Sequence, residues 1–320
     1  MTVQLVFQVP EAGGFPKEIL MSACDEDAVT PISAPALEAH VRKLAHEIGE
    51  RHVFRPQSLA EARDYIRSCW EAEGYVVEAQ TYEVMDVPCS NLSIILPGTR
   101  LPGQVVLMGA HYDTVRGSPG ADDNASGVAA LLELGRRLYV CRPGRTIRLV
   151  AFVNEEAPFF YWGKMGSVIY ARAARQRNED IRAMFSLEML GCYNDEPRSQ
   201  RYPPFLGRGR SSQGNFIAFV SNLRSRPLLN SALAAFKTST NFPVEGTAAF
   251  SWVPGVSWSD HLSFWRSGYP ALMITDTAFF RYRHYHSSQD TPGKLDYARM
   301  AAVVEGLARM LIRLADDDNL

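Results

Sequence analysis

The chain has 320 residues, of which 46% are hydrophobic and 21% are charged, and its formal net charge is -2. This length suffices for one large α/β domain or two small ones, and the composition is that of an ordinary globular protein. No Lys/Arg-rich run and no stretch of about eighteen apolar residues occurs, so we expect neither nucleic-acid binding nor a membrane span.

The cysteines are few, odd in number and without a CxxC pair: Cys24, Cys69, Cys89, Cys141 and Cys192. Such usage is typical of reduced thiols in a cytosolic protein, and a disulfide is the less favoured alternative. The segment from Met1 to Pro10 lacks the basic and apolar regions of a secretory signal. We therefore expect a cytoplasmic protein, with secretion of a processed form as the alternative.

The N-terminal part of the sequence predicts an arm followed by two helices and two strands. Residues 1–34 show no clear hydrophobic period and are predicted to form an arm on the domain. Apolar positions recur with helical spacing over 36–48 and 58–73, and Ser58 with Glu61 forms a predicted capping box. Strands are predicted over 75–82 and 90–96.

Strands and helices alternate through the rest of the chain. We predict strands at 105–110, 146–153, 183–187, 216–220 and 271–275, and helices at 128–138, 167–175, 227–238 and 297–315. This alternation predicts a single doubly wound α/β domain over 35–320, with a central mixed, mainly parallel sheet and helices on both faces. The Pro-, Gly- and Arg-rich residues 192–215 are predicted to form a long loop near the site.

Acids and histidines occur where these predicted strands end, at the edge of the sheet where α/β proteins bind ligands. Each residue alone has an ordinary explanation as a helix cap, a packed histidine or a solvated acid. Together they would repel or desolvate one another without a cation, and imidazole with carboxylate ligands suits zinc, or alternatively manganese or cobalt. The residues are His111, Asp122–Asp123, Glu155–Glu156, Glu188, His284 and His286.

Six segments around these residues resemble metallopeptidase family 28. These are two-zinc exopeptidases that include bacterial leucyl aminopeptidases, and they are related to glutaminyl cyclases and glutamate carboxypeptidases. The segments occur in the family's order and span about residues 36–315: 109–113 (GAHYD), 120–127 (GADDNASG), 154–156 (NEE), 186–189 (SLEM), 259–261 (SDH) and 286–291 (HSSQDT).

The resemblance implies a role for each matching residue. Asp123 would bridge two zinc ions, and a non-proline cis bond would follow it. His111 and Glu188 would complete one metal site, and Glu156 and His286 the other. Glu155 would be the general base, and Asp113 would hold the imidazole of His111 in its metal-binding tautomer.

Some residues depart from the family's pattern or stay open between two interpretations. Glu188 stands where many members have Asp, and Val256 stands where bacterial leucyl aminopeptidases have a tyrosine that assists the oxyanion. The aromatic segment 157–162 is either a packed loop or a wall of the specificity pocket. We interpret Arg281 and Arg283 as solvated loop charges, in preference to a clamp for a substrate carboxylate. We expect structural roles for Asp260 and His261 and no role for His284.

The implied activity is that of an aminopeptidase, which hydrolyses N-terminal residues from peptides through a dizinc-bound hydroxide. A zinc acyltransferase of the glutaminyl-cyclase type is the first alternative, but such enzymes use one zinc and the ligand set here is complete for two. A carboxypeptidase acting on short acidic peptides is supported only by the arginines. A non-catalytic binding protein is disfavoured because Glu155 and every ligand are present. The oligomeric state is not predicted.

Overall fold

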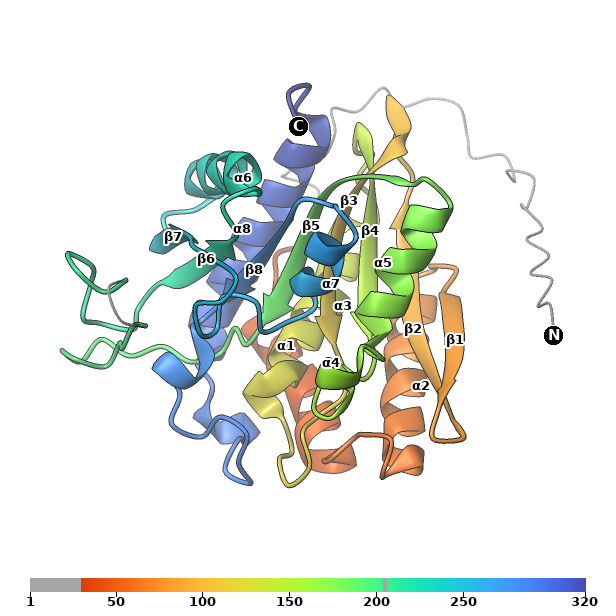
Figure 1. Cartoon of the computed structure of the whole chain (residues 1–320), viewed down its shortest axis with the longest axis horizontal. Coiled ribbons are helices and arrows are strands. Elements are labelled where there is room, and N and C mark those ends of the chain that lie inside the picture. The colour runs from red at the N-terminus through yellow and green to blue at the C-terminus, as the bar shows by residue number, and fades with distance from the viewer. Residues whose placement is uncertain (1–29, 204–205) are drawn as a thin grey trace.

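The computed structural model describes residues 30–203 and 206–320, which form an eight-stranded mixed sheet in the order β1-β2-β4-β3-β5-β8-β6-β7 (Figure 1). The strands β3, β4, β5 and β8 run parallel at its centre. On one side β2 and β1 follow as antiparallel strands, and on the other β6 is antiparallel to β8 and parallel to β7. The fold class predicted from the sequence is therefore confirmed. The strands are β1 (Glu78–Val84), β2 (Val87–Leu96), β3 (Leu101–His111), β4 (Arg145–Phe152), β5 (Asp180–Glu188), β6 (Ile217–Ser221), β7 (Val244–Ala248) and β8 (Ala271–Thr275).

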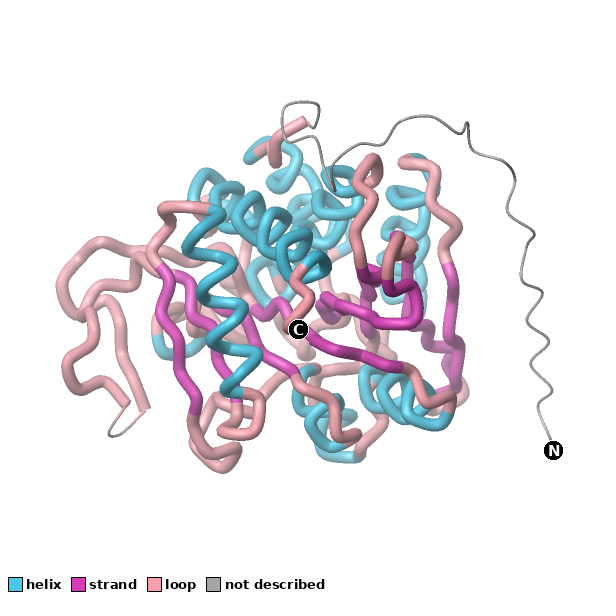
Figure 2. Tube along the Cα trace, turned by 90° about the horizontal axis from the view of Figure 1, so that it is seen from above, coloured by secondary structure: helices cyan, strands magenta, loops and turns pink. Residues whose placement is uncertain are grey.

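Helices cover both faces of this sheet (Figure 2). On one face α1 (Ala34–Arg42), α2 (Pro56–Ala72), α3 (Gly127–Leu138), α6 (Arg226–Ser239) and α8 (Tyr297–Asp316) pack together, and on the other α5 (Gly166–Gln176) packs on α7 (His261–Arg266). Alternate residues of β3 supply the two cores: Val106 and Met108 face the larger layer, and Val105 and Leu107 face α5 and α7. Burial on both faces explains why the central strands are continuously apolar.

The structure corrects several predicted boundaries. Helix α2 begins at Pro56 rather than at a capping box on Ser58, because proline suits the first helical position, where no N–H partner is needed. A π-helical segment (Lys43–Ile48) follows α1 where one continuous helix was predicted. The edge strand β1 begins at Glu78 rather than at residue 75. The short elements β7 and α7 were missed, because five or six residues carry little periodic signal.

The remaining predictions are confirmed in part. Residues 192–215 connect β5 to β6 as a long loop. Cys69, Cys89 and Cys192 are free thiols as expected, but Cys141 is disulfide-bonded, so the prediction of reduced thiols is wrong there. Most of the predicted arm, residues 1–29, lies outside the described residues, and the division at residue 34 stays a prediction. Within the described part of the chain, no helix has the length and apolar character needed to cross a membrane.

Candidate metal centre

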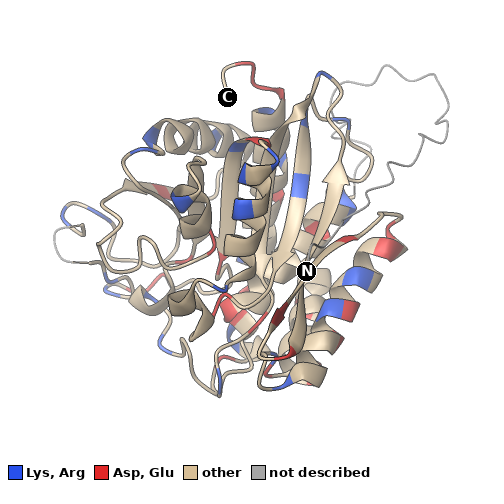
Figure 3. Cartoon of the chain, turned by 45° about the vertical axis from the view of Figure 1, so that its right-hand side comes forward, with Lys and Arg blue, Asp and Glu red and all other residues tan. Residues whose placement is uncertain are grey.

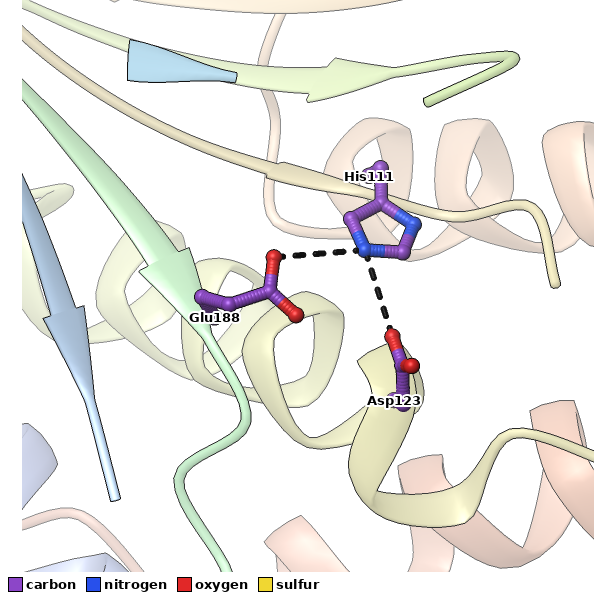
Figure 4. Close-up of side chains that lie close together, drawn as sticks. All are labelled: His111, Asp123 and Glu188. Carbon is purple, nitrogen blue, oxygen red and sulfur yellow. Dashed lines mark ion pairs between the residues drawn. The ribbon is translucent and has the colours of Figure 1, made fainter. Parts of the chain in front are cut away.

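Three predicted ligands meet at the carboxyl ends of the central strands. His111 is the last residue of β3 and Glu188 the last of the adjacent parallel strand β5, so the sheet places the two side by side. The His111 Nε2 atom lies 3.5 Å from Glu188 Oε2 and 3.4 Å from Asp123 Oδ1 (Figure 4). Asp123 comes from the irregular turn Ala121–Ser126 that opens α3, and its bond to Asn124 is cis, as predicted.

Asp123 also belongs to a second group of ligand atoms. The His286 Nε2 atom lies 3.0 Å from Asp123 Oδ2 and 3.3 Å from Glu156 Oε1. Glu156 follows β4, and His286 comes from the loop between β8 and α8. Each of the two groups could hold one cation, and the carboxylate of Asp123 gives one oxygen to each. All five predicted ligands are thus brought together.

The chemistry of these atoms fits a cation. Asp123 Oδ2 and Glu156 Oε1 are buried and accept no hydrogen bond from the described residues. Buried carboxylate oxygens without a partner are costly, and a metal ion between them and the imidazole nitrogens would remove that cost. Two imidazole nitrogens and three carboxylates form a set typical of zinc.

Asp113 positions the neighbouring acid pair. Its carboxylate accepts hydrogen bonds from the backbone N–H groups of Glu155 (3.0 Å) and Glu156 (3.2 Å). The Nδ1 atom of His111 lies 3.2 Å from the backbone oxygen of Asp113 and 3.6 Å from its carboxylate. Donation from Nδ1 to that carbonyl leaves Nε2 free to face a metal. Asp113 therefore contacts His111 through its backbone oxygen, and its carboxylate fixes the loop that carries Glu155.

Glu155 stands apart from both ligand groups. Its side chain is 7% exposed and belongs to neither set of converging atoms. Burial raises the pKa of Glu155 well above its usual range, although the charge of His111 opposes the shift. A buried carboxyl group beside a metal centre, with no ligand role, has the position needed for proton transfer.

Comparison with known proteins agrees with this geometry. The model of peptidase family M28 matches residues 91–311. The chain belongs to peptidase family M28. The uncharacterized protein YfbL of Escherichia coli K12 is 35% identical over 288 residues, which cover 87% of this chain and 88% of YfbL.

Solved structures share the fold of this M28 chain. A zinc aminopeptidase from Bacillus subtilis superposes with a TM-score of 0.71 at 14% identity, covering 90% of this chain and 96% of that one. A glutaminyl cyclase from Fimbriiglobus ruber gives a TM-score of 0.68 at 18% identity, covering 88% and 96%. Because a hydrolase and a cyclase have this same fold, the fold alone does not select the reaction.

Several supporting residues of the M28 site escaped the sequence analysis. The carboxylate of Asp290 accepts hydrogen bonds from the N–H groups of Asp122 (2.9 Å) and Asp123 (3.1 Å). Arg51 is fully buried and donates to the carbonyls of Tyr112 (2.7 Å) and Gly120 (2.9 Å), so it joins the turn before Asp123 to the end of β3. Asp290 lies in a matching motif, but a lone arginine before α2 gave no signal of burial.

The other open residues are now placed. His261 is fully buried, its Nε2 lies 2.8 Å from the carbonyl of Val256, and burial lowers its pKa to about 4. It belongs to neither ligand group. His284 is in neither ligand group. Arg281 is only 8% exposed and donates to Gln200 and to the carbonyl of Cys192, so its prediction as a solvated loop charge is wrong. Arg283 is exposed.

An apolar pocket opens beside Glu188. Its floor consists of Ala218 and Val220 on β6, which pair across the sheet with Thr275 and Met273 on β8. Thr275 in turn pairs with Glu188, so the floor is continuous with the metal centre. The loop 192–215 contributes to the rim, as predicted, whereas residues 157–162 do not line this pocket.

An aromatic wall links the pocket to a metal ligand. Trp258 packs on Phe279, Phe279 packs on Tyr285, and the Tyr285 ring stacks 3.8 Å from that of His286. Burial raises the pKa of Tyr285, and the nearby carboxylates of Asp123 and Glu156 raise it further, so its hydroxyl stays protonated. The Tyr285 ring therefore lies against a metal ligand, whereas Val256 leaves the family's tyrosine position without a hydroxyl. Its position directly before His286 was the only sequence signal.

Metal uptake is expected to release protons and to weaken as the pH falls. Burial lowers the pKa of His286, but its contacts with Asp123 and Glu156 outweigh burial and raise the pKa to about 11. At neutral pH the metal-free imidazole therefore carries a proton that a cation must displace. Zinc affinity, measured with a competing chelator at pH 6, 7 and 8, should rise roughly tenfold per pH unit for each displaced proton. Equal affinity at all three pH values would contradict this expectation.

Proposed function

We propose that the chain is a zinc aminopeptidase that removes apolar N-terminal residues from peptides. The observation that carries this proposal is the arrangement of Glu155, a carboxyl group outside the ligand set, beside two complete ligand groups that share Asp123. The pocket that opens at Glu188 gives a place for one apolar side chain. The two groups support two zinc ions, and manganese or cobalt would suit the same donors.

The residues divide the chemistry between them. Zinc at such a site would supply Lewis acidity, which polarises a carbonyl group and makes a water molecule more acidic. Glu155 accepts the proton of the attacking water and returns it to the nitrogen of the leaving amine. The Asp113 carboxylate holds Glu155 in place by accepting a hydrogen bond from its backbone N–H group. Tyr285, whose ring stacks on that of His286, is the residue we propose as the donor to the developing oxyanion.

The carboxylates also explain a requirement for a free N-terminus. A protonated substrate amine is attracted by the acids that surround the centre, while its side chain enters the pocket on the floor of β6 and β8. A peptide with an acetylated N-terminus lacks that charge. The proposal is tested with leucine p-nitroanilide and its N-acetyl form, using zinc-loaded and chelated protein. Cleavage of the acetylated form alone would contradict it.

The pocket floor should set the preference for the N-terminal residue. Ala218 is 7% exposed and lies opposite Thr275, so Ala218→Leu would fill the floor without reaching the ligands. We expect kcat/KM for leucine substrates to fall roughly tenfold or more relative to alanine substrates. Val220→Ala should shift the ratio in the opposite direction. A ratio that is unchanged in both variants would mean that the side chain binds elsewhere.

A glutaminyl-cyclase reaction is the second candidate, and it is supported by the fold shared with the Fimbriiglobus ruber enzyme. The presence of both ligand groups favours the hydrolase. The carboxypeptidase alternative loses part of its support, because Arg281 is buried and bonded to Gln200 and Cys192. The two main candidates differ in their product: a hydrolase releases a free amino acid, whereas a cyclase retains the residue and releases ammonia.

A further inference from the structure

A basic groove lies between α5 and α7, on the face of the sheet opposite the larger helical layer. Arg172 and Arg175 on α5 line it together with Arg266 at the end of α7, and the serines Ser263 and Ser267 lie between them. Residues three apart on a helix share one face, so Arg172 and Arg175 project side by side. All three arginines are exposed, and Figure 3 shows the Lys and Arg positions along α5.

The positive charge of this groove is not neutralised by the described part of the chain. None of the three arginines forms an ion pair with a described acid, whereas Arg148 and Arg177 nearby both pair with Glu179, at 2.8 and 2.7 Å. Arg175 lies over the ring of Tyr269, 5.7 Å from its centroid, which holds its guanidinium at the groove. With a chain net charge of -2, this positive potential is local.

The groove begins at the catalytic edge of the sheet. Gly163, at one end of it, directly follows α4 (Phe159–Trp162), whose first N–H group donates to the carbonyl of Glu156 (2.9 Å). The N–H of Gly166 at the start of α5 donates to the carbonyl of Val153 at the end of β4. The Gly163 end of the groove therefore lies beside the segment that carries Glu155 and Glu156.

The spacing of the arginines suits an extended polypeptide. With a rise of about 1.5 Å per residue, Arg172 and Arg175 lie about 9 and 13 Å along α5 from Gly166. An extended peptide advances about 3.3 Å per residue, so it covers that distance in roughly three to four residues. Alternate residues of such a peptide point to one side about 7 Å apart, within reach of neighbouring guanidinium groups, which bind carboxylates in a bidentate manner.

We propose that this groove binds acidic side chains in the downstream part of a peptide substrate, several residues beyond the bond that is cut. The inference rests on the proposed peptidase function and names the substrate class: peptides with an apolar first residue and Asp or Glu further along. The closeness of the Gly163 end of the groove to the segment that carries the acid pair favours a peptide carboxylate over a lipid or nucleic-acid phosphate at this position.

The test compares matched decapeptides that begin with leucine and carry either two Asp or two Asn residues, two positions apart. A series of such peptides places this pair of residues at successive distances from the N-terminus. We expect kcat/KM to favour the Asp peptides by about three- to tenfold at low salt, with an optimum at least four residues from the N-terminus. The preference should decline as salt rises. The double variant Arg172→Gln/Arg266→Gln should abolish this preference with little change for the Asn peptides. The control Arg224→Gln/Arg226→Gln, just before and at the first residue of α6, should retain it.

Equal cleavage of the Asp and Asn peptides by the wild type would overturn the assignment. So would an equal loss of the preference for Asp peptides in both double variants. Binding of the fluorescent Asp peptide to Glu155→Gln protein, read by anisotropy, separates this failure from failure of the proposed function. If no peptide is cleaved but binding still depends on Arg172 and Arg266, the peptidase function fails and the groove assignment stands. Tighter binding of anionic vesicles or of an oligonucleotide than of the Asp peptide would overturn the choice of ligand.

Discussion

Glu155→Gln protein is expected to keep its full metal content while its kcat falls roughly 10²–10⁴-fold. The amide has nearly the same shape as the carboxyl group, so it should remain in the buried position that the backbone bond to Asp113 defines. It cannot accept a proton from water, however, and proton transfer is the role that its place outside both ligand groups indicates. The measurements are kcat on leucine p-nitroanilide and metal content by elemental analysis.

Glu156→Gln provides the matched comparison, because the two acids are neighbours and differ only in what they face. Glu156 Oε1 lies 3.3 Å from the His286 nitrogen within a ligand group, so its amide should weaken metal binding as well as turnover. If instead Glu155→Gln loses metal and Glu156→Gln retains it, the roles of the two glutamates are exchanged.

Asp123→Asn is expected to lower metal affinity by roughly 10²-fold or more and to abolish turnover. The two carboxylate oxygens of Asp123 serve different groups, with Oδ1 3.4 Å from His111 Nε2 and Oδ2 3.0 Å from His286 Nε2. An asparagine has one oxygen and one NH₂ group and no charge, so at least one ligand group would face a donor in place of an acceptor. Metal content is measured after dialysis against buffer of defined free zinc.

Asp122→Asn is the matched control at the adjacent position. Asp122 is also fully buried, but its Oδ1 accepts a hydrogen bond from the N–H of Gly191 (2.8 Å), which an amide oxygen can accept equally. This variant should keep its metal and most of its activity. Loss of metal in both variants would show that the turn before α3, rather than the bridging carboxylate, determines the effect of Asp123→Asn.

The central sheet could be predicted from sequence because its strands are buried on both faces. The runs in β3, β4, β5 and β8 are short, apolar and alternate with helices, and this pattern indicates a parallel sheet. Elements at the edges carried weaker signals: every residue of β7 is half-buried, and β1 begins three residues later than predicted. At such positions tertiary contacts, rather than local pattern, decide the boundary.

The ligand set was predictable for a related reason, since parallel strands end at one edge and bring His111, Glu188 and the acid pair together there. Residues that act through tertiary contacts were not predictable. Arg51 has the local sequence of a solvated arginine, but it is fully buried and its guanidinium donates to five backbone carbonyls. Nor could the partners of Ala218 and Val220 be predicted, because the pocket floor depends on the antiparallel register of β6 with β8.

The most direct measurement follows the products of a leucine-initiated hexapeptide over time by mass spectrometry, with zinc-loaded wild-type protein. The proposed function predicts free leucine first and then successive loss of residues from the N-terminus, with no product from the N-acetylated peptide or after chelation. A companion peptide that begins with glutamine should release glutamine. Loss of ammonia with retention of that residue, cleavage from the C-terminus, or no product at all from zinc-loaded protein would contradict the assignment as an aminopeptidase.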